Sequence, residues 1–323
     1  MKLENVLVTG GSGFIGRHLV CTLSEQGIRV TVPARHRERA KNLILLPTVD
    51  VVEANVLAPG VLERLARGQQ AVINLVGILH SRRGRPDERG PNGYGPDFAR
   101  IHVELPQAIV AACRAQGVRR LLHLSALGGS PSAPSEYLRS KAIGEQAVLA
   151  ADDLEVTVFR PSVVFGPEDR FLNQFALLLR LMPVLAIPCP RARFQPVYVG
   201  DVARALLHAL DDPDTHGKAY ELCGPREYSL QELVALVGRI TGRERVVLGL
   251  SDRLSYLQAA IMEKLPGRLM TRDNYRSMQL PNVCTGQFPF GLQPRALEGL
   301  APAWLAPSGA VERSSRLRWR AGR

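Results

Sequence analysis

The amino-acid sequence predicts an α/β protein built on a doubly wound parallel sheet, with a smaller lobe following it in the chain. Short apolar runs alternate with segments of helical periodicity through the first half of the chain, which is the pattern of repeated strand–helix–strand units. A glycine-rich turn follows the first apolar run. The alternation stops after Gly166, which indicates that a different architecture begins there.

The predicted strands are brief and apolar throughout, as expected for a sheet that is covered on both faces. They lie at 6–8, 29–32, 49–53, 71–76, 121–124 and 156–159. The helices between them are predicted from apolar residues at helical spacing and from glycine stop signals. They lie at 17–26, 62–66, 101–116 and 135–149.

Glycines at every third position form the turn between the first strand and the first helix. Glycine permits positive φ and a close approach of backbone to phosphate, while the helix start attracts negative charge, so this turn can bind the pyrophosphate of a dinucleotide. The expected cofactor contacts here are Gly10, Ser12, Gly13, Phe14, Ile15 and Gly16. The alternative is a glycine-rich turn that binds nothing.

The end of the second strand predicts which dinucleotide is preferred. An acidic residue at this position would accept from the 2′-OH of NAD, whereas an arginine suits the 2′-phosphate of NADP. The chain has Arg35 here, with Arg37 and Arg39 close by, and no acid before Glu38. We therefore expect NADP(H) to be preferred, with NAD(H) as the alternative; a solvated loop arginine would carry no preference.

Further cofactor contacts are expected where the third and fourth strands end. The Asn55 amide can bond the adenine edge, with Val56 beside it. Gly77 follows the fourth strand and lets the cofactor pass close to Leu75 and Val76. Residues 80–98 are rich in Gly, Pro and Arg, and are predicted to be a loop that is either a lid over the site or disordered.

Tyr137 and Lys141 are the candidate catalytic pair. They are four residues apart on a predicted helix, and therefore share one face. An ammonium near a tyrosine is expected to lower the tyrosine's pKa, and such a phenol can exchange a proton with a substrate hydroxyl or carbonyl. Ser125 follows the fifth strand and is expected at the same site. The alternative is a pair of ordinary surface residues.

Residues 166–305 are expected to form mostly a substrate-side lobe, and 1–165 the dinucleotide-binding domain. Helices are predicted at 171–181, 201–210 and 230–240, with Asp201 as an N-cap and 194–210 returning to pack on the first domain. Residues 251–265 are amphipathic, and their apolar face is expected to pack on the lobe itself rather than on a membrane. That face carries Leu254, Leu257, Ile261 and Leu265. Residues 272–304 show little regular pattern.

Composition limits the partners. The net charge of +11 is concentrated partly in 81–100 and 313–323, which favours an anionic cofactor or an acidic membrane surface. No nucleic-acid motif accompanies it. The five cysteines are scattered singly, so neither a zinc site, nor any other metal site, nor a disulfide framework is expected. A cytoplasmic location is expected, without a signal peptide or a bilayer-spanning segment.

The motifs resemble the short-chain dehydrogenase/reductase superfamily, in its extended or atypical branch of NAD-dependent epimerase/dehydratase-like proteins. They are residues 10–16, 74–77, 124–126, 160–166 and the pair Tyr137 and Lys141. Within that branch, 135–145, 160–173, 194–201 and 269–282 are similar to the NADPH-binding accessory subunit of mitochondrial complex I and its bacterial relatives. The resemblance implies a Rossmann fold with bound NADP(H), and cofactor contacts from Pro161 and Val163.

The resemblance leaves two functions open. One is an oxidoreductase or epimerase acting on a small carbonyl or hydroxyl compound, related to sugar nucleotides or quinones. The other is a non-catalytic nucleotide-binding accessory or assembly protein of a respiratory or quinone-pathway complex. Active members of the superfamily carry Ser or Thr where this chain has Ala126, which favours the second function, although Ser125 or Ser130 could substitute.

The C-terminal segment 306–323 is expected to be a flexible basic tail. It contains five arginines with Leu317 and Trp319, and has too little apolar surface to fold onto the core. Weak peripheral binding to the inner face of a membrane is one role for it, and an inert solvated tail is the other.

Overall fold

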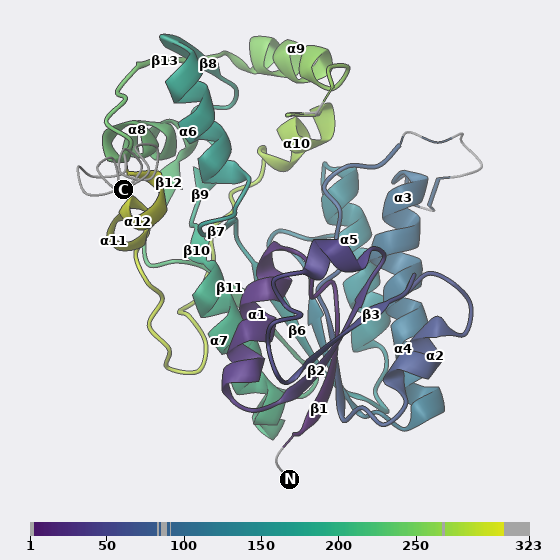
Figure 1. Ribbon diagram of the computed structural model, residues 1–323. Helices are drawn as coiled ribbons and strands as arrows, with labels where there is room; N and C mark the ends of the chain where they lie inside the picture. Colours follow the sequence, from purple (N-terminus) through teal and green to yellow (C-terminus); the bar gives the residue numbers. More distant parts are fainter. Residues whose placement is uncertain (1–2, 83, 85–88, 91, 267–268, 307–323) are drawn as a thin grey trace, which may run out of the picture.

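The central sheet contains seven parallel strands (Figure 1). The computed structural model describes residues 3–82, 84, 89–90, 92–266 and 269–306. Across the sheet the strands are β11 (Lys218–Leu222), β6 (Glu155–Pro161), β5 (Arg120–Leu124), β4 (Ala71–Asn74), β1 (Asn5–Thr9), β2 (Arg29–Ala34) and β3 (Val49–Glu53). Six of them coincide with the predicted strands. The seventh, β11, has no counterpart among the predicted strands; it lies within 166–305 and pairs with β6 in parallel register.

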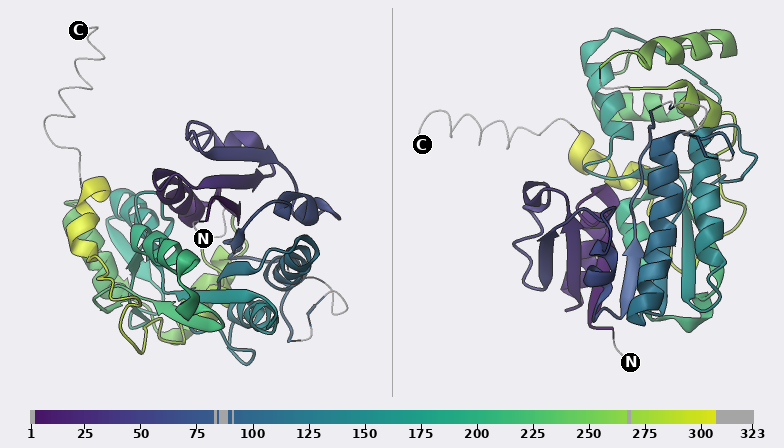
Figure 2. Two further views of the ribbon diagram at one scale, coloured as in Figure 1. Left: turned by 90° about the horizontal axis from the view of Figure 1, so that it is seen from below. Right: turned by 90° about the vertical axis from the view of Figure 1, so that its right-hand side faces the viewer.

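Helices cover both faces of this sheet, as the apolar strands require (Figure 2). On one face, α1 (Phe14–Glu25) packs with α7 (Val199–Asp211) through Leu19, Leu23 and Leu206. On the other face lie α2 (Val61–Ala66), α4 (Leu105–Gln116) and α5 (Glu136–Leu149). The doubly wound fold class is therefore confirmed.

Two helix starts differ from the prediction. The segment predicted as one helix from residue 101 begins as the short α3 (Pro96–Phe98), continues as a π-helical stretch Ala99–Glu104 and then becomes α4. Helix α7 starts at Val199, so Asp201 is not its N-cap. The buried Asp201 carboxylate instead accepts from the Arg295 backbone N–H at 2.6 Å and from its Nε at 2.9 Å.

The second lobe is built from helices and two-stranded ribbons around its own apolar core (Figure 1). The helices are α6 (Phe171–Leu181), α8 (Leu230–Ile240), α9 (Asp252–Met262), α10 (Arg272–Ser277), α11 (Leu297–Leu300) and α12 (Pro302–Leu305). The ribbons are β7 (Val164–Phe165) with β10 (Val197–Tyr198), β9 (Arg193–Phe194) with β12 (Tyr228–Ser229), and β8 (Val184–Ile187) with β13 (Val246–Gly249). The last three helices fall in the stretch for which the sequence showed little pattern, because each is only four to six residues long.

The chain after α10 runs back to the end of β6 and fastens the lobe there. The Asn282 side-chain oxygen accepts from Ser162 Oγ at 2.6 Å and from the Val163 N–H at 2.9 Å. Cys223 and Cys284 form a disulfide with their Cα atoms 6.0 Å apart. The expectation of no disulfide was wrong, because the partners are 61 residues apart and only the return of the chain to β11 brings them together.

The apolar face of α9 was predicted to be buried against the lobe, but the structure leaves it exposed. Leu254, Leu257 and Ile261 are each more than half accessible to solvent. The tail from 307 lies outside the described residues. Within the parts of the chain that the structure describes, no helix is both long enough and apolar enough to cross a bilayer.

Candidate active site

The glycine turn forms a cradle between β1 and α1. Gly10 has a φ of +78°, and a Cβ at Gly10 would lie 2.9 Å from the Leu75 backbone. A Cβ at Gly16 would lie 2.3 Å from the Gly10 carbonyl oxygen, so α1 can seat this close to the turn only without a side chain there. Gly13 is exposed and caps α1, with Ser12, Phe14 and Ile15 half-buried around it. The shape and the open helix start fit a dinucleotide pyrophosphate.

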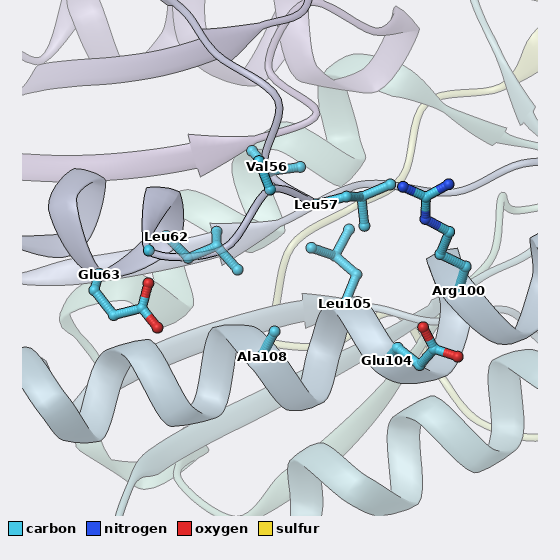
Figure 3. A pocket seen from close by; sticks show the side chains of 10 residues that line it. Val56, Leu57, Leu62, Glu63, Arg100, Glu104, Leu105 and Ala108 are labelled. Carbon is cyan, nitrogen blue, oxygen red and sulfur yellow. The ribbon is translucent and has the colours of Figure 1, made fainter.

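The predicted adenosine contacts lie on two neighbouring strand ends. Arg35 is exposed directly after β2, next to the turn Arg37–Ala40. Asn55 is exposed after β3, and its side-chain oxygen accepts from the Leu57 N–H at 3.2 Å. Val56 lines a cavity of about 210 Å³ between α2 and the start of α4, shown in Figure 3. Other residues lining it include Leu57, Leu62, Arg100, Glu104, Leu105 and Ala108. Asn55 is not part of that lining.

The turn after β4 lies between the glycine cradle and the candidate pair Tyr137 and Lys141. Its Leu75 backbone faces Gly10, and its Val76 N–H donates to the Asn74 side chain at 3.2 Å. A Cβ on Gly77 would lie 3.9 Å from Lys141 Nζ. The structure therefore brings these predicted contacts together with Lys141. Pro161 ends β6, while the Val163 amide is already bound by Asn282.

Burial moves the pKa values of Tyr137 and Lys141 in opposite directions. Lys141 is only 4% exposed and its Nζ donates to the Leu124 carbonyl at 2.6 Å; burial lowers its pKa to about 8. Burial raises the pKa of Tyr137 to about 12. The expected lowering of the tyrosine pKa was wrong, because the loss of water around the phenol dominates and the Leu124 carbonyl holds the ammonium.

Ser125 and its neighbours present buried polar atoms to the same site. Neither Ser125 Oγ nor His123 Nε2 has a hydrogen-bond partner among the residues that the structure describes. The other His123 nitrogen lies 3.1 Å from the Asn74 amide nitrogen, and Asn74 in turn accepts from Thr9 at 3.0 Å. Because buried polar atoms are almost always satisfied, this pair fits a site that receives a polar ligand group. Ala126, next to Ser125, is buried.

Two histidines that the sequence analysis missed support this arrangement. His102 Nδ1 lies 2.8 Å from Ser140 Oγ, while its Nε2 accepts from the Ile78 N–H at 3.1 Å, so one neutral ring ties α5 to the turn after β4. Burial holds the pKa of both His102 and His123 well below the ordinary value. The signal in the sequence was a polar residue inside an otherwise apolar run, as at Asn74 and His123.

One residue of the second lobe, Asp273, contacts the helix that carries Tyr137 and Lys141. Asp273, in α10, accepts from the Glu136 N–H at 2.7 Å and from the Tyr137 N–H at 3.0 Å. Ser135 caps the next amide of α5 through the Leu138 N–H. Asp273 therefore holds the first turn of the helix that carries Tyr137 and Lys141, and no pattern in the sequence indicated it.

Two aromatic residues of the segment 80–98 pack close to this site. Tyr94 and Phe98 are buried, and the Phe98 ring centroid lies 6.2 Å from that of Tyr137. A second cavity, of about 250 Å³, lies between this loop, the start of α5 and the ends of α9 and α10. Among the residues lining it are Leu79, Phe98, Glu136, Asp273 and Arg276.

Replacing Lys141 by Met is expected to stabilise the cofactor-free protein by roughly 1–2 kcal/mol near neutral pH, because it removes a buried charge. The folded pKa of Lys141 is about 8 and its ordinary value is 10.5. Between these values the unfolded chain binds more protons, so wild-type stability rises with pH and the advantage of the variant shrinks. Urea unfolding at pH values below and above these two pKa values measures the difference in stability between variant and wild type. Exposed Lys218→Met is the control. A pH-independent difference would contradict the explanation.

Replacing Asp273 by Asn is expected to lower the free energy of unfolding by about 1–3 kcal/mol. The two N–H groups bind different carboxylate oxygens, and an amide has an NH2 group in place of one of them and lacks the charge that favours a helix start. Thermal or urea unfolding measures the loss. Asp252→Asn, at an exposed position in the first turn of α9, is the matched control and should change little. Equal effects of the two substitutions would show that Asp273 is not a special contact.

Comparison with known sequences shows the family to which this chain belongs. Residues 6–223 match the family model described as the NAD dependent epimerase/dehydratase family. The chain is 34% identical over 244 residues to NADH dehydrogenase [ubiquinone] 1 alpha subcomplex subunit 9, mitochondrial, of Mus musculus; this covers 73% of the chain and 61% of the mouse protein. It is also 34% identical over 203 residues to a ceramide reductase of Caulobacter vibrioides, covering 62% of the chain and 59% of that protein.

Solved structures show the same fold at low identity. A nucleoside-diphosphate-sugar epimerase of Staphylococcus aureus superposes with a TM-score of 0.69 at 19% identity, covering 91% of this chain and 98% of the other. The UDP-glucuronic acid 4-epimerase of Bacillus cereus, solved with UDP-glucuronic acid and NAD, gives a TM-score of 0.64 at 19% identity, with 77% and 86% covered. With the glycine cradle, the seven-stranded sheet and the matched residues 6–223 in agreement, the chain belongs to the NAD-dependent epimerase/dehydratase family.

Proposed function

We propose that this protein is an NADP(H)-dependent oxidoreductase or epimerase acting on a small carbonyl or hydroxyl compound. One observation supports this most directly: Tyr137 and Lys141 lie one turn apart on α5, near the residues that follow β4 and β5. There Gly77 lies next to Lys141, and Ser125 Oγ is buried with no partner among the described residues. A glycine turn without a catalytic pair would support binding alone.

In this proposal the glycine cradle holds the pyrophosphate, Asn55 and Val56 bind the adenine side, and Arg35 binds a 2′-phosphate. The bound dinucleotide supplies or accepts a hydride at its nicotinamide. Tyr137 moves a proton to or from the substrate oxygen, and Ser125 Oγ donates a hydrogen bond to that oxygen in place of the residue that Ala126 replaces. Lys141 places a positive charge beside Gly77, and can bond the nicotinamide ribose.

The raised pKa of Tyr137 favours one direction. A phenol with a pKa of about 12 keeps its proton near neutral pH and is therefore ready to donate it to a carbonyl oxygen as the hydride arrives. The alcohol would be the product. Relatives named as reductases support this direction, among them the ceramide reductase and a 2-alkyl-3-oxoalkanoate reductase of Stenotrophomonas maltophilia that is 27% identical over 294 residues. A sugar-nucleotide or quinone-related substrate remains within the proposal.

A second candidate is a nucleotide-binding accessory or assembly protein of a respiratory or quinone-pathway complex. Ala126, at the position where active relatives carry a hydroxyl, and the similarity to the mouse NADH dehydrogenase subunit favour it. In that case the purified protein would bind the dinucleotide but would not oxidise NADPH with any carbonyl compound. Turnover with an alkyl ketone, a quinone or a sugar nucleotide would decide for the enzyme.

Replacing Arg35 by Ala is expected to weaken NADPH binding at least about tenfold, because a charge-assisted contact to the 2′-phosphate is lost, while NADH binding changes little. Calorimetric titration of both dinucleotides measures this. Exposed Arg29→Ala, at the other end of β2, is the control. Equal losses for NADPH and NADH would rule out the role of Arg35.

Replacing Tyr137 by Phe is expected to abolish turnover and leave NADPH affinity nearly unchanged, because the ring still packs beside Phe98 and His102 but cannot transfer a proton. Stopped-flow or steady-state NADPH oxidation measures kcat, and titration measures binding. A Phe variant that turns over at the wild-type rate would show that another group is the acid.

A further inference from the structure

Helix α9 packs on the lobe through small side chains and exposes large apolar ones, the reverse of an ordinary surface helix. Its two fully buried side chains are small, Ser255 and Ala259, whereas its large apolar residues face outward. Leu254, Leu257 and Ile261 are 52%, 54% and 56% exposed. Surface helices normally bury this face, so the fold leaves an apolar face uncovered here.

The neighbouring β8–β13 ribbon also carries exposed apolar side chains. The Gln258 side chain of α9 donates to the Ala186 carbonyl of β8 at 3.1 Å, which fixes the helix beside the ribbon. Val184 and Val246 are direct partners across the ribbon and both are exposed, as is Leu248 on the same face. We call this combined surface, formed by α9 and the β8–β13 ribbon, the apolar end.

The apolar end lies at the opposite end of the described structure from the start of β1 (Figure 1). Figures 1 and 2 show α9 and the β8–β13 ribbon together at the tip of the second lobe, beyond the carboxyl ends of the sheet strands. The part of the first domain that the structure describes lies below it. A planar surface could therefore contact this tip without touching the described part of the sheet domain.

Charge at the apolar end is mainly positive. The exposed cations on α9, on the ribbon and on the segments leading to it are Arg180, Arg243, Arg245, Arg253 and Lys264. The exposed anions on the same segments are Glu244 and Asp252, and Glu263 is half-buried in an ion pair with Arg272 at 2.8 Å. Large apolar side chains within a basic border are the composition of a helix that lies in the headgroup region of an anionic bilayer.

We propose that the apolar end, with Leu254, Leu257 and Ile261 inserted among lipid headgroups, docks this protein peripherally on an anionic lipid bilayer. Charge complementarity favours a bilayer over two other possible occupants of this surface, a second copy of the protein and its own basic tail. A second copy would bring the same basic border against itself, and the tail 306–323, with its five arginines, would meet a surface of its own sign. An anionic bilayer complements both the border and the net charge of +11.

Docking in this orientation would bring the second cavity close to the membrane. Glu263, which follows the last residue of α9, lines that cavity, as does Asp273, which holds the first turn of the Tyr137 helix. A compound leaving the bilayer beside α9 would therefore reach a cavity next to the proposed active site. The docking itself does not depend on catalysis, and it is tested separately.

The test is flotation of the full-length protein with vesicles of phosphatidylcholine alone or mixed with phosphatidylglycerol. We expect binding to the mixed vesicles only, weakening as salt screens the charges. Leu257→Gln combined with Ile261→Gln should reduce partitioning at least about tenfold, because two inserted apolar side chains are lost. Arg253→Gln with Lys264→Gln should weaken binding at low salt.

The matched control is Ile44→Gln with Leu45→Gln, two adjacent exposed apolar residues of the first domain, which should bind like wild type. Circular dichroism checks that each variant folds. Binding of the Leu257 and Ile261 double variant at the wild-type level would assign membrane affinity to another part of the chain and overturn the proposal. Absence of wild-type binding, or a dimer seen by light scattering that this variant disrupts, would overturn it as well.

Discussion

The close approach of α1 to the first strand is the constraint on which the site depends. It exists only because Gly16 lacks a Cβ, which would press on the Gly10 carbonyl oxygen. Gly10 in turn lies against the turn after β4, where a Cβ would press on the Leu75 backbone. This approach places the start of α1 over the end of β1 and beside the turn after β4. The same turn leads to Gly77, which faces Lys141. A side chain at either glycine would therefore disturb the cradle and the position of the turn together.

The helix that carries Tyr137 and Lys141 is held from both domains. Ser140 and His102 tie α5 to the turn after β4, and Asp273 caps its first turn from the second lobe. Asn282 and the Cys223–Cys284 disulfide fasten the returning chain that follows α10. Because a carboxylate from the lobe binds the Tyr137 amide itself, a shift of the lobe would move the tyrosine. The lobe thus supports the position of the helix that carries Tyr137.

Burial gives the two members of the pair different protonation behaviour. Tyr137 keeps its proton more firmly than a free phenol, and Lys141 releases its proton more easily than a free ammonium. Both shifts follow from removing water around a group that would be charged in one of its forms. The site therefore combines a phenol that can act as an acid with a lysine whose charge is sensitive to its surroundings. The neutral ring of His102 packs against Tyr137, and the neutral ring of His123 is buried near Lys141.

The sequence alone determined the sheet, its glycine turn and the Tyr137–Lys141 pair, because each depends on local rules: alternating apolar runs, positive φ at glycine and the period of a helix. It could not predict Asp273 as a cap, the Cys223–Cys284 bond or β11 as a sheet strand, since each joins segments that are far apart in the chain. The direction of the Tyr137 pKa shift was also wrong, because burial is a property of the packed structure. Periodicity likewise identified the apolar face of α9 but not whether it is covered. Only the tertiary structure decided that, by burying Ser255 and Ala259 and leaving Leu257 and Ile261 exposed.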